Sequence, residues 1–178
     1  IRSAMSRNEA EEGGAVAVLA GHFDATQCGF EANIAANGAA VAVLGPRATA
    51  SLDASTMNAN VASQKGGALW TTAGGAAVLA NGTLVEHNTA PSGPSIWIER
   101  GGNVEYRLPA PMGRWVLADN GVSRLMPGGF TDLPFACAPG VFGDSLELDA
   151  QSGPGCSSNC PAGKVCPGAC TNPEECPR

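Results

Sequence analysis

The sequence predicts an all-β fold, a parallel β-helix (solenoid) followed by a disulfide-rich, loop-rich module. Three observations predict it. Short segments recur every 25 to 28 residues, glycine and a short alternating strand follow each recurrence, and six of the seven cysteines lie near the C-terminal end. No segment shows the i, i+3, i+4 pattern of a helical repeat, so we expect one coil per repeat with strands stacked about 4.8 Å apart.

An asparagine defines the repeat. A large apolar residue stands three residues before each asparagine, and a small residue stands five before it. The four matching segments are "SAMSRN" (3–8), "CGFEAN" (28–33), "STMNAN" (55–60) and "TLVEHN" (83–88), which end at Asn8, Asn33, Asn60 and Asn88. We expect each asparagine at a corner of its coil, because asparagine tolerates the left-handed conformation. Stacked coil on coil, the four side chains would form a hydrogen-bonded ladder.

Glycine precedes a short strand in each repeat and is expected to make a second sharp turn, where φ is positive. The segments are "GGAVAVL", "GAAVAVL", "GGALWTT" and "GPSIWIE". Alternation predicts three inward columns, which are Met5, Phe30, Met57 and Val85; Val16, Val41, Leu69 and Ile96; and Val18, Val43, Thr71 and Ile98. It places Ala17, Ala42, Trp70 and Trp97 on the outer face.

These motifs resemble the GGA[ILV] and FxxN repeats of the polymorphic outer-membrane proteins. The matching stretches are 13–16, 66–69 and 30–33, with looser versions at 57–60 and 85–88. That family is best known for chlamydial surface adhesins, and similar repeats occur in large secreted proteins of algae and other protists. The resemblance covers roughly residues 1 to 100 and implies a right-handed parallel β-helix.

The C-terminal part resembles the ephrin-receptor-like cysteine-rich module of extracellular proteins. Residues 137–140 ("CAPG") and 160–163 ("CPAG") carry this match, although the cysteine spacing departs from that module and implies no pairing. The segment "YRLPAPMGRW" (106–115) is similar to connectors in protist surface proteins. We therefore expect solenoid coils over 1–100, a connecting and capping segment over 101–135, and the cysteine-rich module over 136–178.

Composition narrows the function classes. The net charge is −6 without a basic cluster, which disfavours nucleic acid as a partner. No apolar run approaches the ~18 residues needed to span a bilayer, so no membrane insertion is expected. Alanine and glycine are abundant and aromatic residues make up only 5%, which favours thin layers of small, closely packed side chains.

The cysteines indicate an oxidising compartment. Disulfide formation is expected among Cys137, Cys156, Cys160, Cys166, Cys170 and Cys176, because no histidine lies near them and no pair of CxxC knuckles occurs. Cys28 has no cysteine in the neighbouring coils and is expected to be a small buried residue, with an intermolecular disulfide as the alternative. The sequence starts within a repeat and lacks a signal peptide, which suggests a mature piece of a longer secreted protein. Either further coils or a second copy would then cover its first half-coil.

Enzymatic activity is disfavoured. Glycoside hydrolysis needs two carboxyl groups roughly 5 to 10 Å apart, and the outward residues of the best-defined strand are alanines and tryptophans. Asp24 and Asp53 could approach each other on a second face, but we interpret them as solvated turn residues. His22 and His87 have no evident Cys or Asp partner and are interpreted as surface or turn residues.

Two surface features have functional interpretations. Trp70 and Trp97 form a predicted interface for a protein or a sugar, unless the segment around 106–115 folds back over them. Asn81 opens an "NGT" acceptor pattern for N-glycosylation.

We therefore expect a non-enzymatic extracellular structural or assembly protein, a rigid element of a surface filament, flagellar hair or cell-surface layer. An adhesin or carbohydrate-binding surface module is the alternative, and a β-helix polysaccharide lyase or hydrolase is a second, disfavoured one. Expected partners are other copies or other surface proteins of the same assembly, with glycans left open. No cofactor and no metal are expected. The expected location is extracellular, at the cell surface.

Overall fold

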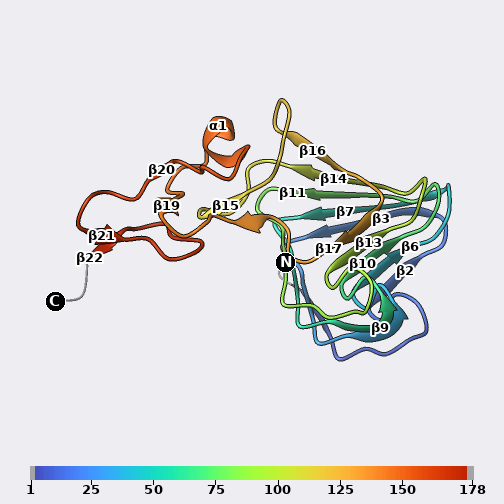
Figure 1. Ribbon diagram of the computed structural model, residues 1–178. Helices are drawn as coiled ribbons and strands as arrows, with labels where there is room; N and C mark the ends of the chain where they lie inside the picture. Colours follow the sequence, from blue (N-terminus) through green and yellow to red (C-terminus); the bar gives the residue numbers. More distant parts are fainter. Residues whose placement is uncertain (1–2, 176–178) are drawn as a thin grey trace. The chain divides into compact units, whose positions relative to one another are not determined.

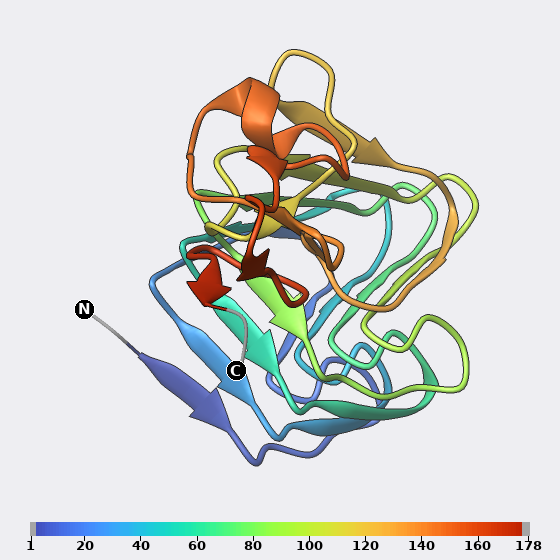
Figure 2. The ribbon, with the colours of Figure 1, turned by 60° about the vertical axis from the view of Figure 1, so that its left-hand side comes forward.

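The computed structural model describes residues 3–175 and confirms the predicted parallel β-solenoid. The chain winds through about four turns, and strands from successive turns form parallel sheets (Figure 1). One sheet has the order β1-β4-β8-β12, and its strands lie side by side from blue to green in Figure 2. Its members are β1 (Ala4–Ser6), β4 (Gly29–Glu31), β8 (Thr56–Asn58) and β12 (Leu84–Glu86).

Two further sheets complete the coil. The second has the order β17-β13-β10-β6-β2, with β2 (Val16–Val18), β6 (Val41–Val43), β10 (Leu69–Thr71), β13 (Ile96–Ile98) and an antiparallel β17 (Gly128–Phe130). The third has the order β16-β14-β11-β7-β3, with β3 (Gly21–Thr26), β7 (Ala48–Asp53), β11 (Ala76–Ala80), β14 (Asn103–Arg107) and β16 (Val122–Leu125). Between the first and second sheets, the second and third coils form a short parallel pair, β5 (Ile34–Asn37) with β9 (Val61–Lys65).

The inward columns have the predicted register. Met5, Phe30, Met57 and Val85 are paired along the first sheet, and the two predicted columns of the second sheet are likewise in register. Phe30, Met57 and Leu69 are completely buried. The third sheet adds larger buried side chains, Leu52, Leu79 and Tyr106. One separate buried cluster contains only alanines: Ala35, Ala39, Ala62 and Ala90. The small side chains of this cluster let the surrounding backbone segments pack closely together.

Thr71 is the exception within these columns. It follows Val43 and precedes Ile98 in the column, it is fully buried, and its hydroxyl has no hydrogen-bond partner. We expect Thr71→Val to stabilise the solenoid by roughly 1 to 2 kcal/mol, because burying an unpaired hydroxyl costs about that much.

Chemical denaturation would measure this effect, and Thr83→Val is the matched control. The Thr83 hydroxyl is also buried, but its oxygen lies 2.8 and 2.7 Å from the Leu52 and Ala80 carbonyl oxygens, which share its one hydrogen, and it accepts from the backbone N–H of Ser55. The same substitution should therefore destabilise the protein at position 83. Equal signs at the two positions would contradict the expectation.

The two corners of the coil differ in how they turn. Gly13, Gly38, Gly66 and Gly93 have φ between 57° and 62°, as expected for the glycine corner. At the asparagine corner the expectation was wrong, because the left-handed residue is the one immediately before each asparagine. These residues are Arg7, Ala32, Ala59 and His87, with φ between 53° and 57°. The asparagine itself follows the turn, and its side chain enters the core.

The described residues fall into two compact units. The first contains the residues up to Tyr106 together with Arg124–Leu133, and the second contains Arg107–Ser123 and the residues from Pro134 onward. The segment expected to connect and cap, 101–135, is thus shared between the units. In the first unit its later part closes the last coil: β17 pairs with β13, and Leu133 exchanges two backbone hydrogen bonds with Val85.

The second unit is built from short pieces. Its strands form three antiparallel pairs, β15 (Arg114–Trp115) with β18 (Phe135–Ala136), β19 (Val141–Phe142) with β20 (Ser158–Asn159), and β21 (Lys164–Val165) with β22 (Glu174–Glu175). Its helix, α1 (Leu148–Gln151), places the buried Gln151 amide against both backbone groups of Ala110 at 2.7 and 2.8 Å. No helix among residues 3–175 is long and apolar enough to cross a membrane.

Candidate functional site

The asparagine ladder runs through the whole solenoid. Asn33 donates from its backbone N–H and from Nδ2 to Oδ1 of Asn60, at 3.0 and 2.9 Å. Asn60 donates in the same way to Oδ1 of Asn88, at 2.9 Å in both bonds. The second Nδ2 hydrogen of each asparagine binds a carbonyl one coil earlier, that of Met5 or Phe30. Asn33 and Asn60 are fully buried, so the ladder satisfies polar groups that water cannot reach.

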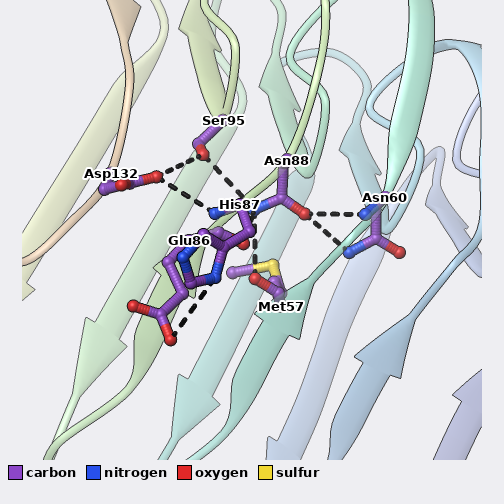
Figure 3. Close-up of polar contacts among 7 residues, drawn as sticks. All are labelled: Met57, Asn60, Glu86, His87, Asn88, Ser95 and Asp132. Atoms are coloured by element: carbon purple, nitrogen blue, oxygen red, sulfur yellow. Dashed lines mark hydrogen bonds and ion pairs between the residues drawn. The ribbon is translucent and has the colours of Figure 1, made fainter.

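The last rung is closed by the returning segment (Figure 3). Asn88 Nδ2 donates to the carbonyls of Met57 and Glu86 at 3.0 and 2.9 Å, and contacts Ser95 Oγ at 3.3 Å. Oδ1 of Asp132 in turn accepts from the His87 backbone N–H and from Ser95 Oγ, at 3.2 and 3.4 Å. In the earlier coils, the equivalent backbone N–H groups of Arg7 and Ala32 donate to carbonyls of the next coil. The Asp132 carboxylate thus takes the place of a carbonyl from a further coil. The His87 ring is exposed, and its Nδ1 lies 3.8 Å from Oε1 of Glu86.

A second ladder uses the small residues five positions before each asparagine. The backbone N–H of Cys28 donates to Ser55 Oγ, and that of Ser55 donates to Thr83 Oγ1. Ser55 Oγ donates to the Asp53 carbonyl, and Cys28 Sγ to the equivalent Thr26 carbonyl at 3.4 Å. Cys28 therefore occupies a hydroxyl position at the end of this ladder, and it is half-buried, not buried as expected.

The outward tryptophans form a polar cluster with two charged residues. Trp70 and Trp97 are directly opposite each other on β10 and β13, and both are half-buried. Oε1 of Glu99 accepts from Lys65 Nζ at 2.6 Å and from Trp70 Nε1 at 3.4 Å, and Lys65 Nζ lies 5.7 Å from the centre of the Trp97 ring. Gly129 of β17 stands opposite Trp97. Tyr106 is buried in the core, where its hydroxyl binds the Thr83 carbonyl.

This cluster predicts a pH dependence. The hydrogen bond from Lys65, helped by Trp70, lowers the pKa of Glu99 despite its partial burial. Because the pKa of Glu99 is lower in the folded than in the unfolded protein, its ion pair with Lys65 contributes its full stabilisation above the unfolded-state pKa. This stabilisation is lost as the pH falls through the folded-state pKa. Glu99→Gln should therefore reduce the free energy of unfolding at pH 7, and the difference from the parent should disappear under strongly acidic conditions. An equal difference at both pH values would contradict this assignment.

The two histidines do not share a site, but His22 does have a carboxylate partner. His22 Nε2 lies 2.8 Å from Asp24 Oδ1, and Nδ1 lies 2.6 Å from Thr49 Oγ1. The interpretation of His22 as lacking an aspartate partner was wrong, because positions 22 and 24 alternate onto the same face of β3. Asp53 lies on the neighbouring strand opposite Thr26, where it binds the Asn81 amide. The His22 and Asp24 side chains are more than half exposed.

The outer face of the first sheet carries a shallow trough. Two adjoining depressions of about 510 and about 210 Å³ share Ala4, Gly29 and Thr56 in their lining. The first is completed by Ser3, Gln27, Cys28 and Ala54, and the second by Phe30, Glu31, Asn58, Leu84 and Glu86. The floor follows the register column Ala4, Gly29, Thr56 and Leu84, and one rim follows Glu31, Asn58 and Glu86.

The outer face of the first sheet differs from that of the second sheet because it carries carboxylates. The outward positions of β4 and β12 do carry carboxylates, Glu31 and Glu86, so carboxylates are not missing from the strand faces. The two glutamates are separated by one strand, which places their backbones about 9 to 10 Å apart. Alanines and tryptophans occupy the outward positions of the second sheet only, so the prediction that carboxylates are missing from the strand faces holds for that sheet alone.

Four of the predicted disulfide cysteines are paired in the second unit. The bonds join Cys137 to Cys156 and Cys160 to Cys166. Cys170 is buried and has no disulfide partner within residues 3–175, and Cys176 lies outside the described residues. No cluster of three or more His, Cys, Asp or Glu side chains in the described part could hold a metal ion. The two disulfides indicate an oxidising, non-cytoplasmic environment.

The disulfides should stabilise the second unit unequally. The first closes a loop of 19 residues and the second a loop of 6, for which the loop entropy corresponds to about 3 and about 2 kcal/mol. We expect the double variant Cys137→Ala/Cys156→Ala to unfold this unit at lower denaturant than Cys160→Ala/Cys166→Ala. Hydrogen exchange would measure each unit separately, with the solenoid amides as the internal control. Equal losses of stability in the two double variants would contradict the prediction. So would a loss of amide protection that extends to the asparagine ladder.

Asn81 is exposed and has φ of 49° in the turn after β11. Thr83 of the same acceptor pattern is buried, and its hydroxyl is used by the second ladder. Asn81 itself is therefore accessible in the folded protein, whereas Thr83 is not.

No family model matches the chain, and neither a curated protein nor a solved structure matches it.

Proposed function

We propose that this chain is a non-enzymatic extracellular structural protein, a stiff element of a surface filament, flagellar hair or cell-surface layer. The observation that carries the proposal is the unbroken asparagine ladder. Each buried rung binds side chain and backbone of adjacent coils, so one coil cannot slide or rotate on the next without leaving buried polar groups unpaired. A solenoid held in this way transmits force along its axis.

Two further features support the proposal. The disulfides of the second unit suit an oxidising environment, where cross-links replace the large core that such a small, loop-rich unit lacks. Beside the last rung, Asp132 accepts from the His87 backbone N–H, and β17 and Leu133 pair with β13 and Val85. These strand edges are therefore closed against uncontrolled strand addition. Glycosylation at Asn81 belongs to the same proposal.

The test is electron microscopy of the native protein purified from its source, with an antibody raised against this chain. Labelling of regular filaments, hairs or layers is the expected result. Labelling confined to dispersed single molecules would overturn the proposal. Loss of assembly by an Asn60→Ala variant that circular dichroism shows to be folded, with assembly retained by Asn8→Ala, would link the assembly to the ladder.

A further inference from the structure

We propose that the trough over the first sheet binds a linear, uncharged oligosaccharide along the solenoid axis. Its shape is the first argument. Residues from four successive coils line it in register, so it extends for about 14 Å across four strands. The larger depression, at about 510 Å³, has the size of a small-molecule site.

The floor is lowest over the first two coils, where its column contains Ala4 and Gly29. Gly29 lacks a side chain, and a Cβ added there would meet only Thr56 Oγ1, at 3.7 Å. Ala4 and Thr56 on either side are exposed. A ligand can therefore lie directly on the strands of the first two coils.

The chemistry of the rims selects the ligand. Gln27, Thr56 and Asn58 supply amide and hydroxyl groups, and Glu31 supplies an exposed carboxylate. The lining contains no lysine and no arginine, and the whole chain has a net charge of −6. Acceptor-rich rims of this kind bind a ligand with many hydroxyl donors and repel an acidic polymer.

An extended peptide fits this surface less well. Peptides that bind sheets gain affinity by adding a strand to a free edge. The trough lies on the face of the sheet, where the N–H and C=O groups of β4 and β8 already bind neighbouring strands. A ligand here must be recognised through side chains alone, as sugar hydroxyls can be.

The experiment is calorimetric titration of the full chain with β-1,4-linked hexaoses of glucose, N-acetylglucosamine and mannose. Hexagalacturonate serves as the anionic probe and hexalysine as the cationic peptide probe. We expect binding of at least one uncharged hexaose, with affinity that rises from dimer to hexamer, and no binding of hexagalacturonate. Preferred binding of hexalysine or hexagalacturonate, or of no hexaose, would overturn the proposal.

Gly29→Leu would test the position of the site. It places a large side chain on the floor, where the Cβ meets only Thr56 Oγ1 at 3.7 Å, and should weaken the hexaose at least tenfold. Ala17→Leu, at an exposed outward position of β2, should leave the affinity unchanged. Equal affinities for the two variants would overturn the placement. Because this test reads binding and not assembly, its failure would leave the structural role standing.

Discussion

Replacing Asn60 by alanine should cost about 4 kcal/mol of folding free energy. Oδ1 of Asn60 accepts two hydrogen bonds from Asn33, and its Nδ2 donates to Asn88 and to the Phe30 carbonyl. All four of these residues are buried in the interior of the solenoid. Each buried donor or acceptor left without a partner costs about 1 to 3 kcal/mol, and the loss approaches the whole stability of a typical small domain.

Asn8→Ala is the matched control, because Asn8 is the exposed first rung. The substitution removes one side-chain bond to Oδ1 of Asn33, which still accepts from the Asn8 backbone N–H. We expect a cost below about 1 kcal/mol. Urea denaturation of both variants would measure the difference. Similar midpoints would mean that the ladder contributes register without stability.

The features predictable from the sequence are those encoded by spacing. The recurrence of the motif every 25 to 28 residues predicts that Asn33, Asn60 and their counterparts stack, because each coil is one repeat long. The alternation of inward and outward side chains in the strands that accompany each motif predicts the inward columns. For the cysteines, the sequence predicts that disulfides form but not which residues pair, because several connectivities satisfy the same spacing.

The features that could not be predicted depend on geometry across the chain. Asp132 closes the ladder from 45 residues beyond His87, and no local pattern announces that contact. The left-handed corner was assigned to the asparagine by conformational preference. In the structure, the asparagine side chain is hydrogen-bonded to the neighbouring coils, and the residue before it, such as Ala59, adopts the left-handed conformation. The His22–Asp24 pair could have been found, because residues two apart on a strand share a face.

Gly67→Ala should be as damaging as loss of the central rung, for a purely steric reason. A Cβ at this position would lie 2.0 Å from the Pro94 carbonyl oxygen and 2.6 Å from the Thr89 backbone nitrogen. Both are backbone atoms of the next coil, so no side-chain rotation can relieve the overlap. The coils would have to separate where the hydrogen bond from the Ala68 N–H to the Ser95 carbonyl joins them. We expect a loss above roughly 4 kcal/mol, at the upper end of single-substitution effects.

Gly29→Ala tests the same chemical change where space is available. Gly29 also lies in the solenoid, but its nearest neighbour would be Thr56 Oγ1 at 3.7 Å. The cost there should stay within about 0.5 kcal/mol, because ordinary van der Waals contact replaces open space and the unfolded chain loses some freedom. Thermal unfolding followed by circular dichroism would compare the two variants. A native-like melting temperature for Gly67→Ala would mean that the coils can separate locally, and the stiffness inferred for the solenoid would then have to come from the ladder alone.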